Sequence, residues 1–185
     1  MLLVPGHFDK TYLSPLYENI YNKAKVHDAS KQMWFEPVPF PDEVGFLSGY
    51  VFPVGFEAPP GEAIGSDKHV LNDHTYCCQL SSKECTSTIS PGEPQVAHAD
   101  QCLQWHRKRI GQRAEDATKL GVPLVITEFG ACLTEGPCSQ EINQVGDVAD
   151  ENLVGWAYWQ FKTYADLTTS AGTGSEGFWN QDGTL

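Results

Sequence analysis

The segment that most constrains the fold is Pro123–Ile126, a short apolar run that leads through Thr127 into Glu128-Phe-Gly130. An apolar run of this length, preceded by Gly121, is typical of a buried strand in a parallel sheet. Glu128 then lies at the carboxyl end of that strand, where parallel α/β folds and barrels build their active sites. Because burying an unpaired carboxylate is costly, Glu128 is either a structural acid bonded to loop amides or a functional group.

The patterns on either side of this strand alternate between helices and strands. Phe8, Tyr12, Leu16 and Ile20 recur at every fourth residue and indicate the apolar face of a first helix, with Tyr17, Tyr21 and Ala24 alongside. In chain order we expect a helix over 9–27, a strand over 32–37, an irregular Pro- and Gly-rich loop over 38–66, a strand over 68–77, a helix over 97–120 that stops at Gly121, the strand at 123–126, a helix over 139–151 capped by Ser139, and a strand over 153–164.

This alternation predicts right-handed βα units around a parallel sheet. A closed (β/α)8 barrel needs eight strands, and the chain offers four in its 185 residues. The sequence therefore predicts an α/β fold of the TIM-barrel type that covers half of a barrel.

Charge and cysteine content narrow the setting in which the protein works. A formal net charge of −12 argues against nucleic acid and anionic membranes as partners, and no apolar segment is long enough to cross a bilayer. The six cysteines favour disulfides, and hence a secretory or lysosomal compartment, over zinc, because no Cys-x-x-Cys is present and zinc would rely on His106 near Cys102. Cys132 and Cys138 bracket a short loop suited to a disulfide, and Cys77 or Cys78 could pair with Cys85 or Cys102.

Three motifs give the chain a resemblance to a known family. They are His74-Thr-Tyr76, Ile126-Thr-Glu-Phe-Gly130 and Trp156-Ala-Tyr-Trp-Gln-Phe-Lys162, in that order. The combination resembles glycoside hydrolase family 5, whose members are retaining (β/α)8-barrel enzymes. Leu3–Leu13 and Trp34-Phe-Glu-Pro-Val38 are most similar to the endoglycoceramidases, which release intact oligosaccharide from ceramide. The resemblance implies that residues 1–185 are the C-terminal part of the catalytic barrel, strands five to eight, without the N-terminal half and without a C-terminal β-sandwich domain.

The resemblance also implies roles for individual residues. Glu128 matches the nucleophile, which forms a covalent glycosyl-enzyme, and Tyr76 and His74 match the pair that holds it in attacking geometry. Trp159 matches the platform under the sugar that is cleaved, and Lys162 could reach a sugar hydroxyl, although a solvated lysine is the alternative. Without the resemblance, His74 and Tyr76 would be ordinary core polar residues and Trp159 part of an aromatic core.

The general acid/base of a retaining glycosidase is the missing group. The family carries it in an Asn-Glu-Pro triplet at the end of strand four, and the sequence has none. The nearest match is Phe35-Glu36-Pro37, one strand late, where Glu36 either lines the cleft, braces a loop or serves as the acid/base. We expect the acid/base upstream of Met1.

Three functions are consistent with these residues. The first is a retaining endo-β-glycosidase acting on glycosphingolipids, or alternatively a cellulase-like β-glucan hydrolase, with no cofactor or metal. For a glycosphingolipid substrate, the apolar residues of loop 38–66 would form either a lipid-facing wall or a packed covering loop; they are Phe46, Leu47, Tyr50, Val51, Phe52 and Phe56. A lipid-facing wall would let a protein without membrane spans act at lipid surfaces. The second is a non-catalytic glycan or glycolipid binder. The third is a half-barrel without independent function, whose exposed strand edges would favour association.

Overall fold

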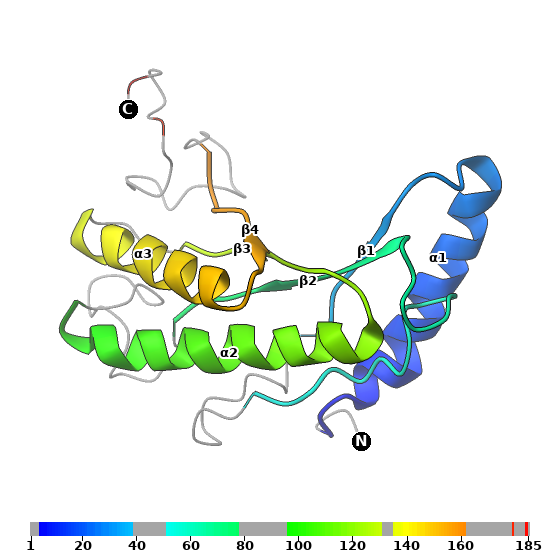
Figure 1. Ribbon diagram of the computed structural model, residues 1–185, viewed down its shortest axis with the longest axis horizontal. Coiled ribbons are helices and arrows are strands. Elements are labelled where there is room, and N and C mark those ends of the chain that lie inside the picture. The colour runs from blue at the N-terminus through cyan, green and yellow to red at the C-terminus, as the bar shows by residue number, and fades with distance from the viewer. Residues whose placement is uncertain are drawn as a thin grey trace. The chain divides into compact units, whose positions relative to one another are not determined.

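The computed structural model describes residues 4–38, 51–77, 96–130 and 135–161, together with Trp179 and Thr184 (Figure 1). The chain divides into two compact units. The first unit comprises Met1–Asp73 and Lys108–Val125, and the second comprises His74–Arg107 and Ile126–Leu185. The unit boundaries fall inside two strands and one helix, so each unit is described through the parts that it contains.

The first unit holds the N-terminal helices and the first strand pair. A π-helical turn η1 (Asp9–Leu13) continues into α1 (Ser14–His27), and β1 (Met33–Phe35) pairs in parallel with β2 (His69–His74). Its core is aromatic, with Phe35 fully buried and its ring 5.1 Å from that of Phe56. Aromatic pairs at this spacing and near-perpendicular orientation stabilise a core beyond their burial.

The second unit holds the first part of α2 (Ala99–Leu120), the end of β3 (Leu124–Glu128), and α3 (Glu135–Glu151) and β4 (Gly155–Trp156), while the rest of α2 and the start of β3 belong to the first unit. The 3-10 turn η3 (Val96–His98) leads into α2, which is followed by β3, α3 and β4. The strands form one sheet in the order β1-β2-β3-β4. Thr75 donates its amide to Glu128, and Ala157 and Trp159 donate theirs to Ile126 and Phe129.

These hydrogen bonds set the direction of every strand. Leu71 bonds to Pro123 and Thr75 to Glu128, so partner numbers rise together along β2 and β3, as they do along β3 and β4. Rising partner numbers define parallel pairing. A four-stranded parallel sheet with helices in its connections is the architecture of half a (β/α)8 barrel, and the predicted fold class is confirmed.

The observed helix and strand boundaries agree with the predicted ones at some positions and differ at others. Gly121 ends α2 at φ +67°, where its amide bonds to Thr118, so the predicted stop is confirmed. The cap predicted at Ser139 is wrong, because α3 begins at Glu135 and Ser139 lies inside it. Strand β4 is much shorter than the predicted strand over 153–164, although its hydrogen bonding continues to Trp159.

The apolar face predicted for the first helix is wrong. Tyr12, Leu16 and Ile20 are exposed, whereas Tyr21 is buried and its ring lies 4.6 Å from that of His69. Asp9 is also buried, and its carboxylate accepts hydrogen bonds from the amides of Val38 and Gly55. The helix therefore packs through a face rotated away from the most hydrophobic one.

One disulfide belongs to the described residues. Cys77 and Cys102 are bonded and buried, which selects one of the pairings that the sequence left open. Cys78, Cys85 and Cys132 lie outside the described residues, so the predicted Cys132–Cys138 bond stays a prediction. Within the described ranges, no helix combines the length and apolar character that a bilayer crossing requires.

Candidate functional site

The centre of the site is a carboxylate held by a phenol, both in the second unit. Glu128 is the last residue of β3, and Tyr76 lies two residues beyond the end of β2. The Tyr76 hydroxyl donates a hydrogen bond to Glu128 Oε1. His74 Nδ1 lies 3.8 Å from the same oxygen. The structure thus brings together three of the predicted site residues.

The position of these side chains follows from the parallel ladder. The amide of Thr75 donates to the Glu128 carbonyl at 3.0 Å, which aligns the ends of β2 and β3. Because side chains alternate along an extended strand, His74 and Tyr76 project to one side and Thr75 to the other. The side chains of His74 and Tyr76 therefore both reach Glu128 at the end of β3.

Glu128 is accessible enough to react. Its side chain is 28% exposed and that of His74 is 32% exposed, in contrast to a fully buried structural acid. A neutral phenol orients the carboxylate and stabilises its charge without supplying a counter-ion. The Glu128 carboxylate is thus bonded to a side-chain hydroxyl and is partly open to solvent.

Trp159 lies beside the end of β3. Its amide donates to the carbonyl of Phe129 at 2.9 Å, and its side chain is 37% exposed. Its carbonyl approaches Gly130 so closely that a Cβ on Gly130 would overlap it, so the glycine after Glu128-Phe129 is required sterically. The peptide bond between Trp159 and Gln160 is cis. An accessible indole in this place can stack on a sugar ring.

The other two predicted binding residues differ in outcome. Glu36 follows β1 in the first unit and accepts a hydrogen bond from Asn72 at 3.1 Å, while its amide donates to the Tyr17 hydroxyl. These contacts brace the segment after β1. Lys162 lies outside the described residues, as do Phe46, Leu47 and Tyr50 of the predicted lipid-facing loop.

A buried polar chain behind Tyr76 was missed by the sequence analysis. Thr75 Oγ1 lies 2.9 Å from His106 Nδ1, and His106 Nε2 lies 3.1 Å from Glu141 Oε2. The Thr75, His106 and Glu141 side chains are all fully buried. The sequence analysis considered His106 only as a weak zinc ligand.

A second missed cluster lies in the first unit, around Asp73. Arg109 donates to Asp73 Oδ1 at 2.6 Å, and Arg113 donates to Asp73 Oδ2 at 2.9 Å. Arg113 also donates to Asp116 at 2.7 Å, and all four side chains are buried. The available signal was the spacing of Cys102, His106, Arg109 and Arg113 on α2, which repeats every three or four residues and marks one helix face.

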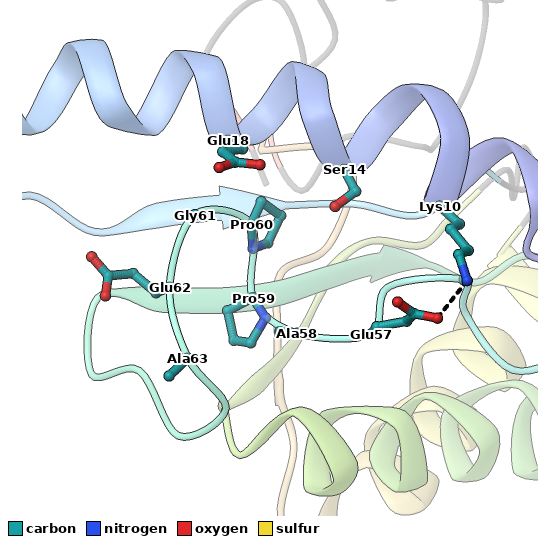
Figure 2. A pocket seen from close by; sticks show the side chains of 11 residues that line it. Lys10, Ser14, Glu18, Glu57, Ala58, Pro59, Pro60, Gly61, Glu62 and Ala63 are labelled. Carbon is teal, nitrogen blue, oxygen red and sulfur yellow. Dashed lines mark hydrogen bonds and ion pairs between the residues drawn. The ribbon is translucent and has the colours of Figure 1, made fainter.

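Other features of the described residues offer no competing chemistry. No group of histidine, cysteine or acidic side chains in the described ranges could hold a metal ion. A hollow of about 620 Å³ in the first unit lies between η1 and α1 on one side and residues 57–63 on the other (Figure 2). Its residues include Glu57, paired with Lys10, and Glu62, paired with Lys25. These are exposed ion pairs, and none of the site residues described above lines the hollow.

Comparison of the sequence with known protein families matches the chain to one family. The family model of cellulases, glycosyl hydrolase family 5, matches residues 53–165, which is more than half of the chain. No curated protein sequence matches significantly.

Solved structures match over nearly the whole chain. Endoglycoceramidase II from Rhodococcus sp., as its lactosyl-enzyme intermediate, aligns with a TM-score of 0.65 at 19% identity, covering 99% of this chain and 35% of that one. The same enzyme in complex with ganglioside GM3 gives a TM-score of 0.64 at 20% identity, with 99% and 36% coverage. An endoglucanase aligns with a TM-score of 0.57 at 12% identity, covering 93% of this chain and 52% of that one. The chain therefore spans about a third of the length of the endoglycoceramidase and shares its fold.

Proposed function

The chain belongs to glycosyl hydrolase family 5, and from this premise we propose that it carries the nucleophile of a retaining endo-β-glycosidase that separates oligosaccharide from ceramide in glycosphingolipids. The single observation that carries the proposal is the hydrogen bond from Tyr76 to the accessible carboxylate of Glu128. A nucleophilic carboxylate must be ionised, oriented and reachable, and this contact meets those requirements without burying the charge.

The proposed reaction proceeds in two steps. Glu128 attacks the anomeric carbon, and the bond to the aglycone oxygen breaks as that oxygen takes a proton from a general acid. The sugar is then held as an ester of Glu128, which water hydrolyses with retention of configuration. Trp159 would support the sugar ring. When Glu128 forms the ester it loses its negative charge, and the hydrogen bond from Tyr76 to Glu128 Oε1 would weaken.

Two observations support the glycolipid as substrate. The endoglycoceramidase of similar fold has been solved with ganglioside GM3 and as a lactosyl-enzyme intermediate. The segment over 38–66 is also rich in aromatic and aliphatic residues, as a site for an amphiphilic substrate requires, although its Val51 and Phe56 are buried and pack as a covering loop would. The competing substrate is a β-glucan, supported by the cellulase family model and by the endoglucanase of similar fold.

We also propose a secretory or lysosomal setting. The support is the buried disulfide between Cys77 and Cys102, because such bonds persist in oxidising compartments.

The nucleophile can be tested without knowing the general acid. A 2-deoxy-2-fluoro-β-lactosyl fluoride carries a leaving group that departs unprotonated, and its fluorine slows hydrolysis of the ester that forms. Incubation of the full chain should add one glycosyl group, and peptide mapping by mass spectrometry should place it on Glu128. The Glu128→Gln variant is the matched control and should stay unlabelled. An unlabelled wild-type chain, or a label on another residue, would contradict the proposal.

A second measurement separates the alternatives. Cleavage of a fluorescent ganglioside with no cleavage of cello-oligosaccharides supports the glycolipid substrate, and the reverse result supports a glucanase. A non-catalytic binder would bind lactose without cleaving either substrate, and its Glu128→Gln variant would keep that affinity.

A further inference from the structure

The residues on both sides of Tyr76 are fastened to α2 by their side chains. Thr75 contacts His106, and Cys77 is bonded to Cys102, one helical turn away on the same face of α2. Tyr76 itself therefore projects from a short stretch of backbone that is attached at two points.

We propose that His106, together with Thr75 and Glu141, positions Tyr76 for its contact with Glu128, an inference that rests on the proposed function of Glu128. His106 touches no substrate in this scheme. It acts through Thr75, whose amide is bonded to the Glu128 carbonyl and whose side chain is bonded to the imidazole. It is thus a positioning residue for the nucleophile.

The two ring nitrogens of His106 join the other two side chains. Nε2 lies 3.1 Å from Glu141 Oε2, and because a carboxylate only accepts, the imidazole donates this bond. Nδ1 lies 2.9 Å from Thr75 Oγ1 and shares a hydrogen bond with that hydroxyl. The imidazole therefore ties the Thr75 side chain to Glu141.

Burial makes this chain of bonds rigid. The Thr75, His106 and Glu141 side chains are fully shielded from water, so each lost bond leaves a polar group without solvent to replace it. Glu141 comes from α3 and His106 from α2, so the two helices together set the end of β2. Apolar side chains could fill this space equally well, but they would not hold the Thr75 hydroxyl through a hydrogen bond.

Fluorine NMR tests the geometry without depending on catalysis. The chain has seven tyrosines, and incorporation of 3-fluorotyrosine with a Tyr76→Phe variant would assign the Tyr76 signal. Thr75→Val removes the hydroxyl at nearly constant shape and should shift or broaden that signal, whereas Thr75→Ser should restore it. An unchanged Tyr76 signal in Thr75→Val would overturn the proposal.

Labelling kinetics test the consequence for the nucleophile. With the fluorosugar probe described above, Thr75→Val should lower the maximal inactivation rate constant by about 10- to 100-fold, the scale expected for a misplaced reacting group. The inhibitor concentration at half-maximal rate and the final label per chain should change little. Glu141→Gln, which keeps an acceptor oxygen, should give a smaller loss, and Thr75→Ser should recover most of the wild-type rate.

The pattern of these values distinguishes positioning from general destabilisation. A merely structural role would lower the fraction of chains that can be labelled while leaving the rate constant of the folded fraction unchanged, and this result would overturn the proposal. Arg107→Ala is the matched control, since Arg107 also joins α2 to α3 through Glu151 at 3.0 Å but lies on the exposed side. It should label like the wild type. A wild-type chain that takes no label contradicts the function of Glu128, and the NMR signals then decide the geometry alone.

Discussion

Asp73 and Glu128 are carboxylates at the ends of neighbouring strands, and their surroundings could hardly differ more. Asp73 is 1% exposed and receives hydrogen bonds from Arg109 and Arg113 on both of its oxygens. Glu128 is 28% exposed, and the group bonded to its Oε1 is the neutral phenol of Tyr76. The same functional group is thus buried among cations in one place and accessible to solvent in the other.

The difference lies in what compensates the charge. Two guanidinium groups neutralise Asp73 and occupy its lone pairs, so the carboxylate serves to hold α2 against β2. The Tyr76 phenol orients Glu128 without bringing a permanent positive charge to it, and His74 Nδ1 lies 3.8 Å from the same oxygen. The two carboxylates therefore differ more in the chemistry of their partners than in their positions at the strand ends.

The largest expected effect is the loss of chemistry on changing Glu128. Glu128→Gln should lower the rate of glycosyl transfer by about 10⁴-fold or more, because removal of a covalent nucleophile has effects on this scale. The free energy of unfolding should change by less than about 1 kcal/mol, since the side chain is partly exposed and the amide can still accept from Tyr76. Labelling kinetics and guanidinium denaturation measure the two quantities. A large loss of stability would remove the contrast with Asp73.

Asp73→Asn should behave in the opposite way. Removing the charge takes away the carboxylate that two buried guanidinium groups bind, although Arg113 keeps its pair with Asp116, and this loss should cost about 3–5 kcal/mol of unfolding free energy. Guanidinium denaturation followed by tryptophan fluorescence gives this value. Glu115→Gln is the matched control, because Glu115 makes an exposed pair with Lys119 on the same helix and should change stability by less than about 1 kcal/mol. Equal stability of the two variants would contradict the structural role of Asp73.

Tyr76→Phe should give an intermediate effect confined to the rate. A hydrogen bond to a charged group contributes about 1.5–3 kcal/mol, so its loss should slow labelling of Glu128 by about 10- to 100-fold. The ring remains to fill the same space, so thermal unfolding should shift little. Tyr12→Phe is the control, because Tyr12 is exposed on the first helical segment. A Tyr76→Phe chain that labels at the wild-type rate would show that the phenol is dispensable.

The sequence predicted the site better than it predicted the packing around the site. The order of helices and strands and the strand-end positions of His74, Tyr76 and Glu128 all followed from local patterns, because parallel strands bring their carboxyl ends to one edge. The contact between Tyr76 and Glu128 came from the resemblance to the family. Hydrophobic periodicity alone would have placed these side chains in an ordinary core.

The errors arose where burial did not follow hydrophobicity. Tyr12, Leu16 and Ile20 form the most apolar stripe of the first helical segment yet are exposed, since periodicity shows that a face exists but not what covers it. Arg109 and Arg113 were not singled out from the sequence, because charged residues are rarely buried unless paired and their partner Asp73 is 36 and 40 residues away in sequence. Pairing at such a separation is a property of the fold.

The smallest expected effect concerns pH and the buried polar groups of the first unit. His69 Nε2 contacts the Pro60 carbonyl at 3.0 Å and Nδ1 contacts the Ser66 hydroxyl at 2.9 Å. Burial lowers the pKa of His69 below its usual value of 6.5, so the folded chain keeps the imidazole neutral at a pH where the unfolded chain protonates it. The unfolded state then binds more protons, and the stability that His69 contributes is lost as the pH falls below about 6.5.

His69→Gln isolates this contribution from the other titrating groups. Between pH 7 and pH 5, the wild type should lose unfolding free energy faster than the variant, with a difference in slope of at most about 1.4 kcal/mol per pH unit, the limit for one proton. Guanidinium denaturation at several pH values measures it. The rate of Glu128 labelling should be affected equally by pH in both proteins, because His69 touches none of the site residues. Parallel stability curves would show that His69 titrates alike in both states, and divergent labelling curves would show that stability and reactivity are not separated between the two regions.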